Sequence, residues 1–131
     1  LNDTIFMKEL KVGEVYKIEN IYYDFNKSNI REDAKPSLNQ LLNLLDRYPQ
    51  MVIQVNSHTD CRGSGAYNMK LSKDRAQSVI RYLHERGISE SRLQFKGYGE
   101  TKPISKCANC NDCTEAQHQQ NRRTEFQIIS M

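Results

Sequence analysis

The sequence predicts an α/β sandwich in which two main helices pack on one face of a mixed four-stranded sheet. The 131-residue chain is long enough for one hydrophobic core but not for two. Segments typical of strands are separated by segments with helical apolar spacing, a pattern that implies crossover connections with helices against a sheet. The predicted order is strand, helix, strand, helix, strand, a loop with a short helix, and a last strand.

The first strand and the first helix are predicted in the N-terminal third. β-branched and aromatic residues in "VYKIENIYYDF" predict a strand over about residues 15–23. A helix follows over about residues 34–48, with Pro36 in its first turn, where a missing N–H costs nothing. Four leucines at helical spacing form its apolar stripe, which are Leu38, Leu41, Leu42 and Leu45.

The second strand and the second helix occupy the middle of the chain. "MVIQV" at 51–55 predicts a short buried strand, and the turn-prone stretch "SHTDCRG" follows it. Ser72 precedes "KDRAQSVIRYLHERG" and predicts the N-terminus of the second helix, with Arg75 in its first turn. Gly87 then supplies the left-handed residue that ends this helix.

The last elements surround a loop rich in cysteine. "RLQFKGYG" predicts a third strand at 92–99, and "KCANCNDCTE" predicts an irregular loop. A short helical turn is expected around "TEAQHQQ". "RTEFQII" at 123–129 predicts the last strand, whose buried face would carry Thr124, Phe126 and Ile128.

Composition and charge argue against nucleic-acid binding and against a membrane-spanning helix. The formal net charge is only +3, and acids and bases are interspersed without the basic block of a phosphate-tracking surface. We therefore expect no nucleic-acid partner, and we expect no cofactor. No apolar run approaches the roughly 18 residues of a membrane helix. Because the chain begins with Leu1, we expect a segment of a longer protein, with any signal peptide or anchor outside it.

The four cysteines allow two kinds of structure. Cys107, Cys110 and Cys113 lie in one loop, and Cys61 lies alone in "TDCRG". Disulfides are favoured, although a zinc site is an alternative if Cys61, His58 or His118 supplied the fourth ligand. Three pairings are possible. One of them closes a small loop between Cys107 and Cys113 and joins Cys61 to Cys110.

Asp60 and Arg75 form the candidate binding pair. Asp60 follows a strand end, where loops commonly display functional groups. A strand, loop and helix of this length can turn both side chains toward one shallow pocket. There a carboxylate would attract an ammonium, and a guanidinium would take a carboxylate through two hydrogen bonds. The pair would thus recognise an amino-acid head group, whereas the simpler alternative is an ion pair that pins the loop to the helix.

The three histidines are not expected to be catalytic. His58 is interpreted as a hydrogen-bonding group at a strand end. His84 and His118 are expected to be solvated. His58, Asp60 and Cys61 lie close together in sequence, but adjacency does not build a nucleophile and its base. An enzyme such as a cell-wall hydrolase is therefore a lesser alternative, as is a zinc-dependent or redox cysteine module.

Four blocks of the sequence together resemble the OmpA C-terminal-like family, which includes Pal lipoproteins and MotB stator proteins. They are "YYDFNKSNI", "VNSHTDCRGSGAYNMKLSKDRAQSVIRYLHERGI", "RLQFKGYGETKPI" and "NRRTEFQI", and the resemblance covers about residues 15–130. Residues 1–14 are then a lead-in segment before a domain at 15–131. The stretch before "NRR" is longer and richer in cysteine than in many members, and it is similar to Bacteroidetes-type versions.

The resemblance implies non-covalent binding of peptidoglycan through the meso-diaminopimelate of its stem peptide. It implies a periplasmic domain that anchors the outer membrane, or an outer-membrane protein or lipoprotein, to the cell wall of a Gram-negative bacterium. The full-length protein would be associated with the membrane through a segment outside this chain. By the same resemblance, Asp60 would meet the diaminopimelate ammonium and Arg75 its carboxylate. The other positions that match the family's ligand groove are Asp24, Phe25, Asn26, Asn68, Leu71 and Arg122.

Overall fold

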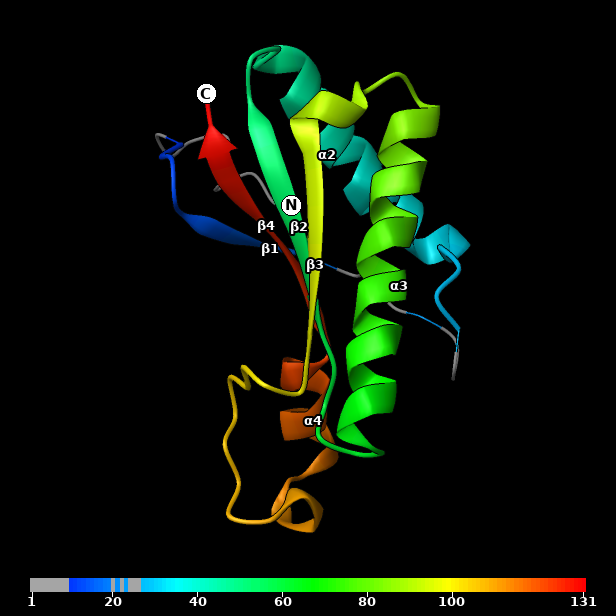
Figure 1. Cartoon of the computed structure of the whole chain (residues 1–131), viewed down its shortest axis with the longest axis vertical. Coiled ribbons are helices and arrows are strands. Elements are labelled where there is room, and N and C mark those ends of the chain that lie inside the picture. The colour runs from blue at the N-terminus through cyan, green and yellow to red at the C-terminus, as the bar shows by residue number, and fades with distance from the viewer. Residues whose placement is uncertain (1–9, 20, 22, 24–26) are drawn as a thin grey trace.

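The computed structural model describes residues 10–19, 21, 23 and 27–131, in which four strands form one open sheet. Their order across the sheet is β1-β4-β2-β3 (Figure 1). β2 and β3 are parallel, and β4 runs antiparallel to both β1 and β2, so the sheet is mixed as predicted. The strands are β1 (Val15–Ile18), β2 (Val52–His58), β3 (Leu93–Gly99) and β4 (Arg123–Ser130).

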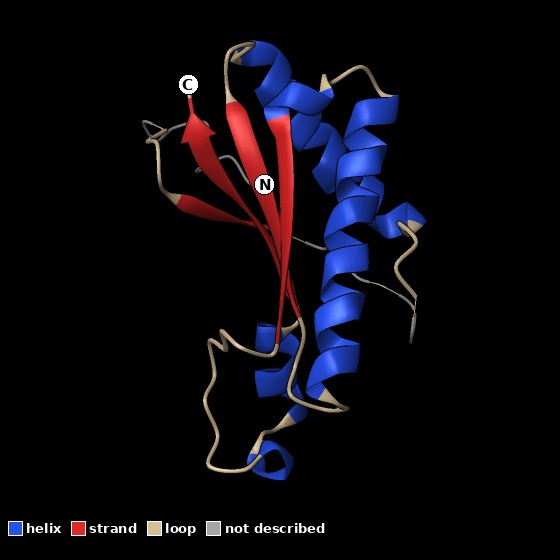
Figure 2. Cartoon of the chain, in the orientation of Figure 1, coloured by secondary structure: helices blue, strands red, loops and turns tan. Residues whose placement is uncertain are grey.

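The two main helices, α2 (Lys35–Arg47) and α3 (Gly65–Glu85), lie on the same side of the sheet (Figures 1 and 2). The predicted fold class is therefore confirmed. A short helix, α4 (Glu115–Asn121), lies beside the end of the sheet where β2 and β3 finish and β4 begins. Among the described residues, no helix is long and apolar enough to cross a membrane.

The hydrophobic core lies between the sheet and the two main helices. Leu38, Leu41 and Leu45 of α2 are fully buried, as predicted. Leu42, on the same predicted stripe, is partly buried and packs against the core, and Leu44 is also buried. The sheet contributes Ile18, Ile53, Val55, Phe126 and Ile128, and Met51 joins the core just before β2.

The first two strands differ in length from their predictions. β1 ends at Ile18, not near residue 23. Ile18 pairs with Thr124 in antiparallel register, and β4 begins at Arg123, so the neighbouring strand offers almost no further residues for β1 to pair with. β2 continues to His58, three residues beyond the predicted end, because polar Asn56, Ser57 and His58 pair on both sides with β3 and β4. The extension of β2 carries the following polar loop to the end of the sheet.

α3 begins at Gly65, well before the N-terminus predicted from Ser72. Its N-cap is Ser64, whose side chain accepts a hydrogen bond from the Tyr67 backbone N–H at 3.1 Å. Arg75 therefore lies about three turns into the helix, not in its first turn. The C-terminal prediction is confirmed, since Gly87 has φ of 104° immediately after the helix.

Gly97 allows α3 to pack closely against β3. A Cβ atom at Gly97 would lie 2.3 Å from the Lys73 backbone nitrogen, which is a severe steric clash. Ser72 is fully buried at the same place, where its Oγ accepts a hydrogen bond from the Gly99 N–H at 2.8 Å. This contact fixes the middle of α3 against the strand that leads to the cysteine loop.

Candidate ligand-binding site

A cavity of about 580 Å³ opens where β2, α3, α4 and the start of β4 meet. This volume is typical of small-molecule sites. Among the described residues of its lining, arginines dominate the charged side chains, with five arginines against two carboxylates. The described lining residues are Ile21, Tyr23, Arg31, Ser57, His58, Thr59, Asp60, Arg62, Tyr67, Asn68, Leu71, Arg75, Glu115, Gln119, Arg122, Arg123 and Thr124.

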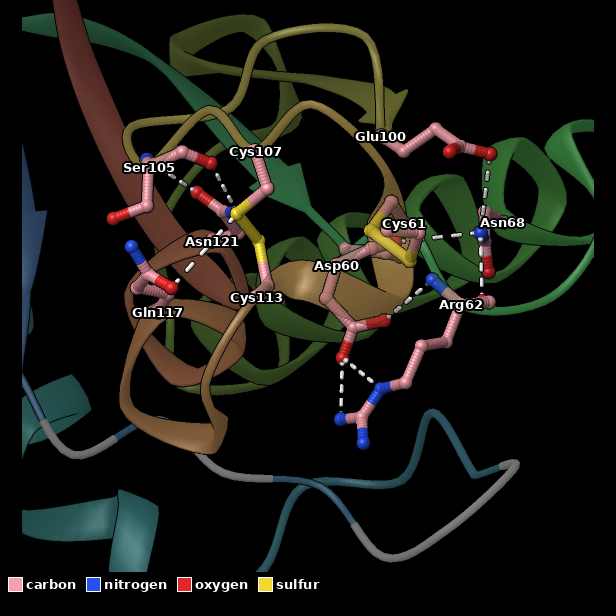
Figure 3. The surroundings of a disulfide bond; sticks show 12 residues. Asp60, Cys61, Arg62, Asn68, Glu100, Ser105, Cys107, Cys113, Gln117 and Asn121 are labelled. Atoms are coloured by element: carbon pink, nitrogen blue, oxygen red, sulfur yellow. Dashed lines mark hydrogen bonds and ion pairs between the residues drawn. A yellow bond between two sulfur atoms is a disulfide. The ribbon is translucent and has the colours of Figure 1, made fainter.

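Asp60 lines the cavity, and its carboxylate is held by two arginines. Arg62 donates from its backbone N–H to Oδ1 at 2.9 Å, and its guanidinium donates to Oδ2 at 2.7 and 3.2 Å (Figure 3). Arg122 donates to the same Oδ2 at 2.6 Å. Burial would raise the pKa of Asp60, but these hydrogen bonds outweigh it and lower the pKa to about 2. Asp60 is thus ionised throughout the neutral range.

Arg75 lines the same cavity but is held by different groups. Its Nε donates to the Lys27 carbonyl oxygen at 3.0 Å, and its guanidinium carbon lies 4.5 Å from the centre of the Tyr23 ring. Burial lowers the pKa of Arg75, while the negative charge of Asp60 acts in the opposite direction. Among the described residues, Asp60 and Arg75 share no hydrogen bond or ion pair. Two opposite charges therefore border one cavity without neutralising each other directly.

Asn68 and Leu71 come from the first turns of α3 and also line the cavity. Asn68 is buried, and its side-chain nitrogen donates to the Arg62 carbonyl oxygen at 3.0 Å (Figure 3). It thereby fixes the loop that carries Asp60. Leu71 is half-buried and supplies an apolar part of the wall.

Glu115 links the two arginines that hold Asp60. It accepts a hydrogen bond from Arg122 at 2.7 Å and another from Arg62 at 3.2 Å. The hydrogen bond from Arg122 is the main reason why the pKa of Glu115 is lowered. Arg62 and Glu115 were not among the predicted site residues. The close spacing of Asp60 and Arg62 in "DCR" is a sequence signal for the first, whereas only the fold brings Glu115 to Asp60.

His58 is a structural hydrogen-bonding group at the end of β2, as predicted. Its Nε2 lies 2.9 Å from Glu125 Oε1, and its ring stacks on Tyr98 with centroids 5.0 Å apart. Burial would raise the pKa of Glu125, but the hydrogen bond from His58 and the charge of Arg123 lower it. His84 is half-exposed, as expected. His118, expected to be solvated, is only 5% exposed because α4 packs it under the cysteine loop.

All four cysteines are paired in disulfides. Cys61 bonds to Cys110 and Cys107 bonds to Cys113, with Cα atoms 5.8 and 5.6 Å apart (Figure 3). These pairs match one of the three arrangements that the sequence allows. Because Cys61 follows Asp60, the first disulfide ties the cysteine loop to the edge of the cavity.

Some predicted site residues cannot be placed. Asp24, Phe25 and Asn26 lie outside the described residues. The predicted ligand roles of Asp60, Arg75, Asn68, Leu71 and Arg122 remain predictions, although all five line one cavity.

An open mixed sheet, two helices on one face and an arginine-rich cavity at one end define a small α/β domain with a candidate binding site. The chain belongs to the OmpA family, whose model matches residues 22–121. The family assignment made from the four sequence blocks is thereby confirmed.

Two relatives and one solved structure illustrate the similarity. A Brucella melitensis protein named peptidoglycan-associated lipoprotein is 34% identical over 105 residues, which are 80% of this chain and 60% of that protein. A Gloeobacter violaceus protein named photosystem I P700 chlorophyll a apoprotein A2 is 41% identical over 111 residues, 84% of this chain but only 13% of that protein. This chain therefore spans less than two thirds of either relative.

The solved structure confirms the fold. The crystal structure of the peptidoglycan-associated lipoprotein from Burkholderia pseudomallei has a TM-score of 0.72 and 29% identity to this chain. The match covers 82% of this chain and 87% of that one. The sheet and helices described above are thus arranged as in that crystal structure.

Proposed function

We propose that this domain binds peptidoglycan non-covalently by holding the amino-acid head group of meso-diaminopimelate in the cavity beside Asp60 and Arg75. The domain is periplasmic, and it would anchor an outer-membrane protein or lipoprotein to the cell wall. One observation carries the proposal. A carboxylate and a guanidinium border the same cavity of about 580 Å³ and make no direct ion pair with each other.

The charges of the cavity fit this ligand. The free end of diaminopimelate carries an ammonium and a carboxylate on one carbon, which matches the two opposite charges. In the described part of the lining, five arginines stand against two carboxylates, which favours a guest with further negative charge, such as the other carboxylates of a stem peptide. Arg75 uses Nε for the Lys27 carbonyl, and its two terminal nitrogens make no hydrogen bond with the described residues. These nitrogens are the donors available to a carboxylate.

Binding of the ammonium requires an exchange of partners. Asp60 already accepts hydrogen bonds from Arg62 and Arg122, so an incoming ammonium must replace at least one of them. Both arginines also bond to exposed Glu115, which can retain them after they leave Asp60. This exchange reduces the net gain on binding. We therefore expect modest affinity for one site, compensated by many anchored copies on one wall.

The enzyme alternative lacks a nucleophile at the predicted place. The sulfur of Cys61 forms a disulfide with Cys110, and Nε2 of His58 forms a hydrogen bond with Glu125. Neither group is therefore arranged as a nucleophile and its base. We therefore propose that the domain binds its ligand non-covalently and catalyses no reaction.

Calorimetric titration with a diaminopimelate-containing muropeptide tests the proposal. Asp60→Asn and Arg75→Gln should each weaken binding at least tenfold, and a lysine-containing muropeptide, which lacks the second carboxylate of that residue, should also bind at least tenfold more weakly. Asp74→Asn, at a partly exposed position of α3, and Arg81→Gln, at an exposed one, are matched controls outside the described cavity lining and should bind like the parent. Arg75→Lys keeps the charge without the planar fork, and circular dichroism checks folding. Parent-like binding by both site variants would refute the assignment.

A further inference from the structure

A second cavity, of about 290 Å³, lies in the cysteine loop and is not used by the proposed function. All four cysteines line it, and Thr59 lines both this cavity and the larger one. Cys61 and Cys110 are only half-buried, so a small reductant can reach their disulfide. The same space would admit an ion.

His118 lies against this disulfide from α4. One imidazole nitrogen of His118 and the sulfurs of Cys61 and Cys110 all lie within 4.8 Å of one another. His118 is only 5% exposed. Its Nδ1 has no hydrogen-bond partner among the described residues. A buried polar atom without a partner is costly and calls for an explanation. A metal ion coordinated by this nitrogen would supply one.

We propose that reduction of the Cys61–Cys110 disulfide converts this cluster into a site for a zinc-class divalent cation, with Cys61, Cys110 and His118 as ligands. Two thiolates and one imidazole form a donor set that suits zinc and leaves the fourth position to a water molecule. The oxidised pair cannot bind the ion in this way, because thiolates rather than disulfide sulfurs are the metal ligands. The disulfide and the metal site therefore exclude each other.

The chemistry balances with a dithiol as the reductant. The dithiol gives two electrons and two protons to the disulfide, is itself oxidised to a disulfide, and leaves Cys61 and Cys110 as thiols. Binding of the cation then displaces the two thiol protons to solvent. The imidazole of His118 donates its lone pair without any change of oxidation state.

The required movement is small. In a tetrahedral zinc site with bonds of about 2.3 Å to sulfur, the two sulfurs lie about 3.8 Å apart. Reduction lets the bonded sulfurs separate to this distance, while the nitrogen of His118 already lies within 4.8 Å of both. Cys110 begins a single 3-10 turn, Cys110–Asp112, in the irregular loop. Thr114 and Gln117 fix the position of α4, and hence of His118, through a capping box.

Zinc titration of the whole chain tests the proposal. The protein is reduced with a phosphine, desalted without oxygen and titrated with Zn²⁺ against a chromophoric chelator, with native mass spectrometry to count ions. We expect one ion per reduced chain and none per oxidised chain. Co²⁺ should give the absorption bands of tetrahedral thiolate coordination in the reduced chain alone. His118→Ala should weaken binding at least tenfold, whereas the control His84→Ala, at a half-exposed position on α3, should not.

Two further measurements keep the test decisive. Cys107→Ser with Cys113→Ser should still bind one ion when reduced, because the proposed ligands remain. Near-ultraviolet circular dichroism must show that the reduced chain stays folded when it binds zinc. The proposal is overturned by a folded reduced chain that binds no zinc, by parent-like affinity in His118→Ala, or by equal affinity in the urea-unfolded reduced chain. Since the test uses no muropeptide, its outcome is independent of the proposed function.

Discussion

Substitution of Asp60 by Asn should remove the part of the pH dependence of the unfolding free energy that comes from the Asp60 carboxylate. The pKa of Asp60 falls from 3.8 to about 2 in the folded chain, and a shift of this size corresponds to about 2 kcal/mol of folding free energy. The Asp60 side chain is only 8% exposed, but that of Arg62 is 49% exposed, so solvent screening weakens the part of this contribution that comes from Arg62. A lowered folded-state pKa contributes stability that is fully present above the unfolded-state pKa. This contribution is lost as the pH falls from about 4 to 2.

Urea unfolding of the parent and of Asp60→Asn between pH 2 and 6 measures this contribution. Urea is preferred to guanidinium chloride because added salt would screen the ion pairs with Arg62 and Arg122. The difference in unfolding free energy between the two proteins should shrink by about 2 kcal/mol as the pH falls from 5 to 2. Acid effects common to both proteins cancel in this difference. If it stays constant over that range, the two arginines do not stabilise the ionised carboxylate of Asp60.

The other predictions concern close packing and the two disulfides. Gly97→Ala should lower the unfolding free energy by about 2 kcal/mol or more, measured by urea denaturation, because its Cβ would collide with the backbone of α3. Replacing Cys61 and Cys110 by Ser opens a link between residues 49 apart in sequence, against 6 for Cys107 and Cys113. The loop-entropy model gives losses of about 4 and about 2 kcal/mol, so thermal unfolding should rank the first double variant as the less stable. An Ala variant as stable as the parent, or the reverse ranking of the double variants, would contradict these arguments.

The spacing of apolar residues and the residues that end helices predicted the fold well. The helical spacing of leucines identified α2, and Gly87 identified the end of α3, because both signals are local. The start of α3 was missed because "GAYNMKL" begins with glycine and has no apolar stripe. Ser72 was mistaken for a cap, whereas its side chain holds the Gly99 N–H of the neighbouring strand.

The site was predictable only in part, since its charges come from distant segments. Asp60 was found from its place after a strand, and Cys61–Cys110 was one of the pairings allowed. No local pattern could show that Arg122 reaches Asp60, because 62 residues separate them in sequence. The burial of His118 was missed for a similar reason. A polar seven-residue helix shows no sign of which side faces the cysteine loop.

The arrangement around Asp60 favours selectivity over tight binding. A cavity with an unoccupied carboxylate would attract many cations, but here any cation must first displace Arg62 or Arg122. A simple cation obtains no compensation for that exchange. Under the proposed function, an amino-acid head group would obtain it from Arg75, whose two terminal nitrogens make no hydrogen bond with the described residues. We therefore expect only a guest that carries both charges to recover the cost of the exchange, so that the arginines that weaken binding would also reject ligands with a single charge.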